Sequence, residues 1–163
     1  MYSTSENLIN RIEKIRLIVI GSGTVEKGMK KMASELDMQA SIIFKGRVSD
    51  KELSKIVASS WLNVHTAVTE GWGLSILEVS ASGTPTVAYN VPGVRDYVED
   101  GLNGIKVKNG DRKALADAAY SIITNPERLW SSSVKVAQKY SWDKTAELWE
   151  LLIKEITKDD FIK

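Results

Sequence analysis

Short apolar runs alternate with longer amphipathic stretches along most of this 163-residue chain, and no other feature restricts its fold as strongly. The first clear run, residues 16–20, is rich in β-branched residues and stops at Gly21-Ser22-Gly23, which is typical of a buried strand entering a turn. Because strand-then-helix units repeat, we expect an α/β fold with a Rossmann-like parallel sheet and helices on both of its faces. Further strands are expected at 41–44, 61–66, 86–89 and 104–107.

The stretches between these runs show the helical spacing of apolar residues. We expect a helix over 24–36, with Thr24 as its N-cap and one apolar face to bury. Ser49 is expected to cap the next helix, with Glu52 completing a capping box. The apolar face of the first helix comprises Val25, Met29, Met32 and Leu36, and the other helices are expected over 73–82, 111–124, 126–139 and 142–157, the last three extending the fold at its C-terminal end.

The composition excludes several classes of protein. Lys and Arg total 22 against 21 Asp and Glu, so no basic excess points to nucleic acid as a partner. The lack of Cys and the single His exclude disulfides and a multi-His zinc site. No apolar run approaches the roughly 20 residues that a membrane helix needs, and the N-terminal residues lack a signal-peptide pattern. We therefore expect a cytoplasmic protein without a transmembrane segment.

In parallel sheets, ligands bind beyond the carboxyl ends of the strands, so the loops there are candidate sites. The turn Gly21-Ser22-Gly23 precedes an expected helix, whose N-terminus can present backbone N–H groups to a phosphate. A dinucleotide fingerprint needs a third Gly where this chain has Glu26, which argues against a standard NAD site. The residues alone leave two interpretations open, a phosphate- or sugar-facing turn and an ordinary tight turn.

The loop after the third expected strand carries more chemistry. Gly71 and Gly73 flank Trp72, so the backbone can approach a ligand closely as the helix begins. The amides of Gly73, Leu74 and Ser75 would point at that ligand from the positive end of the helix dipole, which suits a diphosphate.

Two carboxylates bracket this helix start. Glu70 precedes the helix, and Glu78 lies on it among apolar residues. Each is either an acceptor for ligand hydroxyls or a solvated residue, and for Glu78 pairing with a buried Arg is a further alternative.

The segment from Glu70 to Glu78 resembles the Glu-x7-Glu motif of retaining glycosyltransferases of the GT-B fold, especially family 4. Other segments resemble family motifs in the family's order, over roughly residues 15–155. These segments are the turn 21–23, the loop and helix start 44–53, the strand entry 81–88, then Gly93, 101–104 and Ser141-Trp142. The resemblance implies that the chain is the C-terminal, nucleotide-sugar-binding half of such an enzyme.

The resemblance also implies roles for individual residues. Glu78 would accept hydrogen bonds from the ribose hydroxyls, and Glu70, as the catalytic residue, would contact hydroxyls of the donor sugar. The nucleoside diphosphate sugar would be a substrate, and no cofactor or metal is implied. The other residues implied to bind the donor are Gly21, Gly23, Arg47 and Val48, the last two beside the base, and the backbone of Gly71, Trp72, Gly73, Leu74 and Ser75.

The start of the chain departs from the family pattern. The family's donor domain usually opens with a strand, Gly-Arg-Leu and a Lys-Gly, whose Arg and Lys hold the diphosphate. Residues 1–14 are too short for this strand and its helix, and Gly46-Arg47-Val48 follows a different strand. We therefore expect residues 1–163 to be a single donor-binding domain. It would be a fragment that lacks the N-terminal acceptor domain and is inactive alone.

Some questions stay open at this point. The same architecture also serves sugar-nucleotide epimerases, and a non-catalytic nucleotide-binding or interaction module of the same fold is a further alternative. The residues do not specify the base, the sugar or the acceptor, and peripheral membrane association of the full enzyme stays open.

Several aromatic residues carry further expectations. His65, the only His, ends an expected strand, and we expect it to be a hydrogen-bonded structural residue. Trp72 either packs over a sugar or anchors its loop in the core. Packing is the default role of the tryptophans in the terminal helices, Trp130, Trp142 and Trp149. These helices should nevertheless expose an apolar patch where the missing domain would dock.

Overall fold

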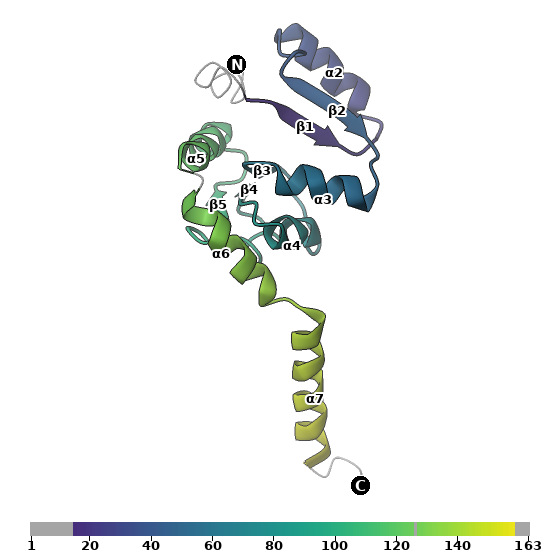
Figure 1. Cartoon of the computed structure of the whole chain (residues 1–163), viewed down its shortest axis with the longest axis vertical. Helices are drawn as coiled ribbons and strands as arrows, with labels where there is room; N and C mark the ends of the chain where they lie inside the picture. The colour runs from purple at the N-terminus through teal and green to yellow at the C-terminus, as the bar shows by residue number, and fades with distance from the viewer. Residues whose placement is uncertain (1–14, 126, 159–163) are drawn as a thin grey trace.

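The computed structural model describes residues 15–125 and 127–158, and Figure 1 shows how their helices and strands are arranged. The strands are β1 (Leu17–Ile20), β2 (Ile42–Gly46), β3 (Asn63–His65), β4 (Thr86–Tyr89) and β5 (Gly104–Val107). The helices are α2 (Glu26–Glu35), α3 (Asp50–Ala58), α4 (Leu74–Ala81), α5 (Arg112–Thr124), α6 (Glu127–Gln138) and α7 (Trp142–Lys158). The expected order of strands and helices is confirmed, including the three terminal helices.

Every strand pairing in the named sheets is parallel. β1 pairs with β2, while β3, β4 and β5 form a second sheet in that order. The predicted α/β class is therefore confirmed. The strands do not form one continuous sheet, because no strand among the described residues lies between β1 and β3 to pair with both.

The β3-β4-β5 sheet contains the core. All four residues of β4 are buried, as expected of an interior strand covered on both faces. Helices α4 and α5 contact β4, and α6 packs on α4. This packing fixes the ends of β3 and β4, from which two loops of the candidate site begin. The central core residues are Ile76, Val87, Val94, Val98, Ile122 and Leu129.

Helix α2 differs from the prediction in two ways. Val25 occupies the N-cap position and no side chain caps the helix, so Thr24 is not the cap. The expected apolar face is not buried, since Val25, Met29 and Met32 are exposed and only Ala33 of the helix is buried. Figure 1 shows α2 beside the narrow β1-β2 sheet at the edge of the molecule, where solvent reaches this face.

Helix α3 begins where the sequence predicts. The Ser49 hydroxyl oxygen accepts a hydrogen bond from the Glu52 amide at 3.3 Å, so this N-cap is confirmed. The second hydrogen bond of a capping box is absent between these two residues. The Glu52 carboxylate instead lies 3.5 Å from Lys45 Nζ.

Helix α7 projects away from both sheets (Figure 1). Its side chains are exposed over residues 142–157, with Trp142 at 88% and Trp149 at 60% exposure. The expectation that these tryptophans pack is therefore wrong, whereas the expected exposed apolar patch is confirmed. Within residues 15–125 and 127–158, no helix combines the length and apolar character needed to cross a bilayer.

Candidate functional site

The segment that follows β3 leads directly into α4. Gly73 occupies the N-cap position with a φ of 53°, in the left-handed region that favours glycine. Its carbonyl oxygen accepts a hydrogen bond from the Ile76 amide at 2.9 Å. The amides of Leu74 and Ser75 donate no hydrogen bond to a described backbone group. These N–H groups lie at the positive end of the helix dipole and are available to an anionic ligand.

Gly93, in the turn after β4, holds this segment in place. It is buried and has a φ of 80°. A Cβ atom at Gly93 would overlap the carbonyl oxygen of Glu70, and a Cβ at Gly73 would lie 2.7 Å from the carbonyl oxygen of Gly93. The two backbones therefore touch, which only glycine permits. No local sequence pattern signals this contact, because it joins loops that follow different strands.

The carboxylate of Glu70 lies beside the imidazole of His65. His65 ends β3, and its Nε2 is 3.3 Å from Glu70 Oε2. This contact lacks hydrogen-bond geometry, and Nε2 is buried without a hydrogen-bond partner. The prediction of a hydrogen-bonded structural His65 is therefore wrong. Sequence reasoning missed this pair, although a lone His five residues before Glu70 was a visible signal.

Several other side chains of the 70–78 segment face solvent, whereas Ile76 is buried in the core. Leu74, Ser75 and Glu78 are exposed, and Trp72 is 72% exposed. Trp72 is therefore not a core anchor, and its ring is available to pack over a ligand. Glu78 is an exposed residue of α4, and among the described side chains no Arg forms an ion pair with it.

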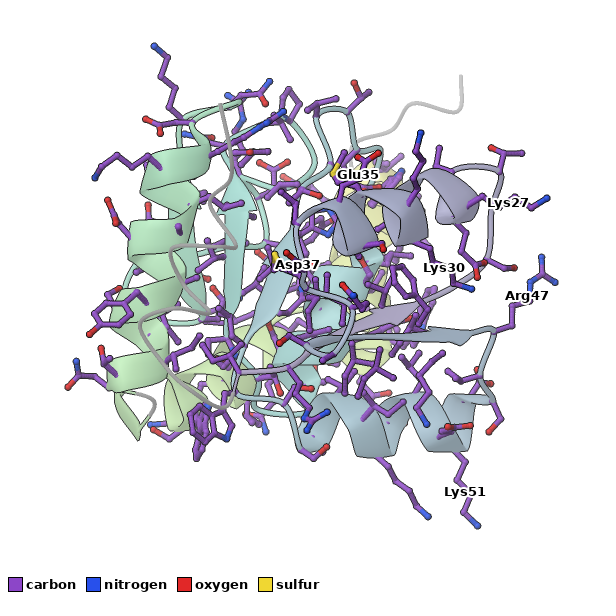
Figure 2. The ribbon with its side chains drawn as sticks, turned by 90° about the horizontal axis from the view of Figure 1, so that it is seen from above. Lys27, Lys30, Glu35, Asp37, Arg47 and Lys51 are labelled. Atoms are coloured by element: carbon purple, nitrogen blue, oxygen red, sulfur yellow. The ribbon has the colours of Figure 1, made fainter. Side chains whose placement is uncertain are left out.

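The turns after β1 and β2 form a second part of the candidate site. The Gly21 amide donates a 2.7 Å hydrogen bond to the Gly46 carbonyl oxygen, so these turns are joined. Gly23 and Arg47 are exposed, while Val48 is half-buried. Figure 2 shows Arg47 projecting from this end of the molecule, on the same side as Lys27 and Lys30. No backbone hydrogen bond among the described residues links these turns to residues 66–75.

Comparison with known proteins identifies the family. The model of the family Glycosyl transferases group 1 matches residues 4–140. The chain belongs to this family. Among its relatives, poly(glycerol-phosphate) alpha-glucosyltransferase of Bacillus subtilis is 28% identical over 155 residues, covering 91% of this chain and 22% of that protein. D-inositol 3-phosphate glycosyltransferase of a Nocardioides species is 32% identical over 136 residues, covering 77% of this chain and 30% of that protein.

This group 1 glycosyltransferase chain spans only 22% to 39% of the length of the first curated relatives it matches. Among solved structures, the pneumococcal O-GlcNAc transferase GtfA in complex with UDP and GlcNAc has a TM-score of 0.82 at 20% identity. The match covers 96% of this chain and 32% of that protein. At this identity the likeness concerns the fold, and the fold is that of GT-B glycosyltransferases, as predicted.

A buried asparagine, Asn103, joins two of the segments that form the candidate site of this group 1 family member. The Oδ1 of Asn103 accepts a 2.7 Å hydrogen bond from the Glu99 amide. Its Nδ2 donates to Ser80 Oγ at 3.1 Å and to the Tyr97 carbonyl oxygen at 2.7 Å. Asn103 is fully buried. It therefore ties α4 to the turn that contains Gly93.

Tyr140, which follows α6, packs against the same turn. Its ring packs edge-on against Tyr97 with centroids 5.2 Å apart, and its hydroxyl donates to the Asp96 carbonyl oxygen at 3.0 Å. Partial burial, together with the nearby Glu99 carboxylate, raises the pKa of Tyr140 above its usual value of 10.0. The phenol therefore stays protonated at neutral pH and keeps donating.

Proposed function

We propose that this chain is the nucleotide-sugar-binding domain of a cytoplasmic, retaining glycosyltransferase of the family 4 type. The whole enzyme would transfer a hexose from a nucleoside diphosphate sugar to an acceptor. The observation that carries this proposal is the pair Glu70 and Glu78 on either side of a helix start whose first amides are free. Group 1 family membership supports it.

The proposed roles follow the chemistry of each group. The free N–H groups of Leu74 and Ser75 would bind the diphosphate, since a helix N-terminus favours negative charge. Glu70 would accept hydrogen bonds from hydroxyls of the sugar, and Glu78 from those of the ribose. The joined turns at Gly21 and Arg47 would line the nucleotide end of the site.

The proposed reaction needs little covalent participation by this domain. The bond between the anomeric carbon and the diphosphate oxygen breaks, and the acceptor oxygen bonds to the anomeric carbon on the same face. The proton of the acceptor hydroxyl passes to the leaving diphosphate. Because negative charge builds on that diphosphate, N–H groups already aimed at it lower the free energy of the transition state.

We also propose that the domain lacks one strand–helix unit and is inactive alone. Support comes from the two sheets, since β1 and β3 each have one edge that no described strand pairs with. Apolar residues of both strands are exposed, with Ile18 at 36% and Val64 at 43%. Interior strands of a parallel sheet normally bury such residues. A further strand between β1 and β3 would join the two sheets and cover them.

Calorimetric titration of the 163-residue chain with UDP-, GDP- and ADP-sugars tests the proposed function. We expect one of the three to bind weakly, with a dissociation constant on the order of 1 mM, because the strand–helix unit that we propose to be missing would carry the Arg and Lys for the diphosphate. NAD is the control and should not bind, since Glu26 replaces the third glycine of its fingerprint. Absence of binding heat with all three nucleotide sugars at millimolar concentration would contradict a nucleotide-sugar role for this chain.

A further inference from the structure

The imidazole of His65, at the end of the partly exposed strand β3, holds a buried nitrogen that lacks a partner. Its Nε2 is buried and has no hydrogen-bond partner among the described residues. A buried polar atom without a partner costs free energy, so it calls for a physical reason. The nearest charged group is the Glu70 carboxylate, whose Oε2 is 3.3 Å away.

The position of the hydrogen on the imidazole ring follows from the geometry of this contact. A bare Nε2 lone pair facing a carboxylate oxygen would be repelled by it, whereas an Nε2–H would be attracted. The ring therefore carries a hydrogen on Nε2. A small rotation of the Glu70 carboxylate would turn the 3.3 Å contact into a charge-assisted hydrogen bond.

Differences in exposure separate the roles of the two residues. The side chain of His65 is 15% exposed and its Nε2 is fully covered, so a ligand cannot reach that atom without displacing protein. The side chain of Glu70 is 30% exposed and can meet a ligand. The Nε2 atom of His65 can therefore act on a bound donor only through Glu70.

We infer that His65 is a positioning residue for Glu70, an inference that rests on the proposed function. Its Nε2–H holds one carboxylate oxygen while the other accepts a hydrogen bond from a hydroxyl of the donor sugar. Gly93 fixes the backbone of Glu70 by contact with its carbonyl oxygen, and His65 then orients the side chain. Binding of the sugar completes the hydrogen bond that the free chain leaves unmade.

Two substitutions of His65 separate this role from a merely structural one. His65→Met keeps an unbranched side chain of similar length but removes the donor, while His65→Gln keeps an N–H that can reach the same position. We expect His65→Met to weaken binding of the nucleotide sugar about tenfold and to leave binding of the matching nucleoside diphosphate unchanged. His65→Gln should restore most of the loss. In a Glu70→Gln background, His65→Met should have little further effect, because the partner charge is gone.

The probes are UDP and UDP-glucose, GDP and GDP-mannose, and ADP and ADP-glucose, titrated calorimetrically into the 163-residue chain. If the unmodified chain binds none of the six, the proposed function fails and this inference fails with it. If it binds, the inference alone is overturned in either of two cases. His65→Met could weaken nucleoside diphosphate and nucleotide sugar equally, or it could weaken neither.

A spectroscopic measurement adds a readout without any ligand. The chain contains one His, so its imidazole gives a single pair of ring ¹⁵N signals. We expect these signals to report a hydrogen on Nε2 and to shift in Glu70→Gln. A neutral ring with its hydrogen on Nδ1, or ring signals that do not change in Glu70→Gln, would overturn the inference.

Discussion

At the scale of single residues, the site depends on backbone contacts that a side chain would block. Gly73 and Gly93 both have positive φ angles and lie against each other. Their contact sets the position of Glu70 relative to the free amides of α4. Such positions are held by the whole surrounding structure, because they are strained for any other residue.

Gly93→Ala should destabilise the chain and move Glu70. The left-handed conformation alone costs Ala about 1 kcal/mol, and overlap with the Glu70 carbonyl oxygen should raise the loss to roughly 3 kcal/mol or more. Urea unfolding measures this loss. Gly110→Ala is the matched control, because its φ of 79° is close to the 80° of Gly93 but nothing lies within 4 Å of the Cβ that the substitution would add. Equal losses in both variants would mean that the contact with Glu70 is unimportant.

Substitutions of Glu70 and Glu78 should weaken the binding of different sets of ligands. Glu78→Gln is expected to weaken nucleoside diphosphates and nucleotide sugars alike, by about tenfold, because it would contact the ribose that both share. Glu70→Gln should weaken only the nucleotide sugars. Calorimetric titration of both variants with UDP and UDP-glucose, or the pair that the chain prefers, measures the difference. The reverse pattern would mean that the roles proposed for the two residues are exchanged.

At the scale of helices and strands, α4 and the turn after β4 form one unit. The unit is held by Asn103, which makes hydrogen bonds to both from a fully buried position. Buried amides of this kind contribute stability only while all their partners are in place.

Asn103→Ala should therefore lower the free energy of unfolding by roughly 2–4 kcal/mol, because it leaves the Glu99 amide and the Tyr97 carbonyl oxygen without their partner. Thermal or urea unfolding measures the change. Asn109→Ala, at an exposed position, is the control and should change stability by no more than about 0.5 kcal/mol. A small effect of Asn103→Ala would show that α4 is held by apolar packing alone.

The sequence predicts most of the elements because their signals are local. The continuous apolar run at 86–89 predicts a buried strand, and Ser49 with Glu52 predicts the start of α3. The burial of α2 could not be predicted in this way, because an apolar face shows what a helix can bury and not whether a neighbour is there to cover it. The division into two sheets has the same cause, since strand pairing depends on distant segments.

In the candidate site, too, local features could be predicted from the sequence and contacts between distant segments could not. Residues 70–75 could be predicted as a glycine-rich segment that leads into a helix, since spacing within one loop encodes it. The contacts of Glu70 with Gly93 and with His65 could not. The first joins loops after different strands, and the second depends on a side-chain orientation that spacing does not fix.

At the scale of the whole molecule, the exposed apolar surface of α7 stands apart from the core. The helix is exposed along its length and projects from the body (Figure 1). A patch of this kind is typical of a surface that another part of a protein covers. Its exposed apolar residues are Trp142, Leu148, Trp149, Leu151, Leu152, Ile153 and Ile156.

Removing residues 142–163 should leave the stability of the body almost unchanged, with a melting temperature within about 2 °C of that of the full chain. The reason is that α7 makes few contacts with the sheets. Binding of a hydrophobic dye should fall sharply in the same truncated chain. Calorimetric melting and dye fluorescence check the two expectations. A large drop in melting temperature would instead show that α7 packs on the body in solution.

The central claim is that the donor binds across the loops that follow the strands, around Glu70 and the start of α4. Amide chemical-shift mapping of the ¹⁵N-labelled chain, titrated with the nucleotide sugar that binds, tests this claim most directly. We predict the largest shifts at residues 70–78, with a second group at 21–24 and 46–49. Shifts centred on α5 and α6, or spread evenly over the chain, would contradict the account.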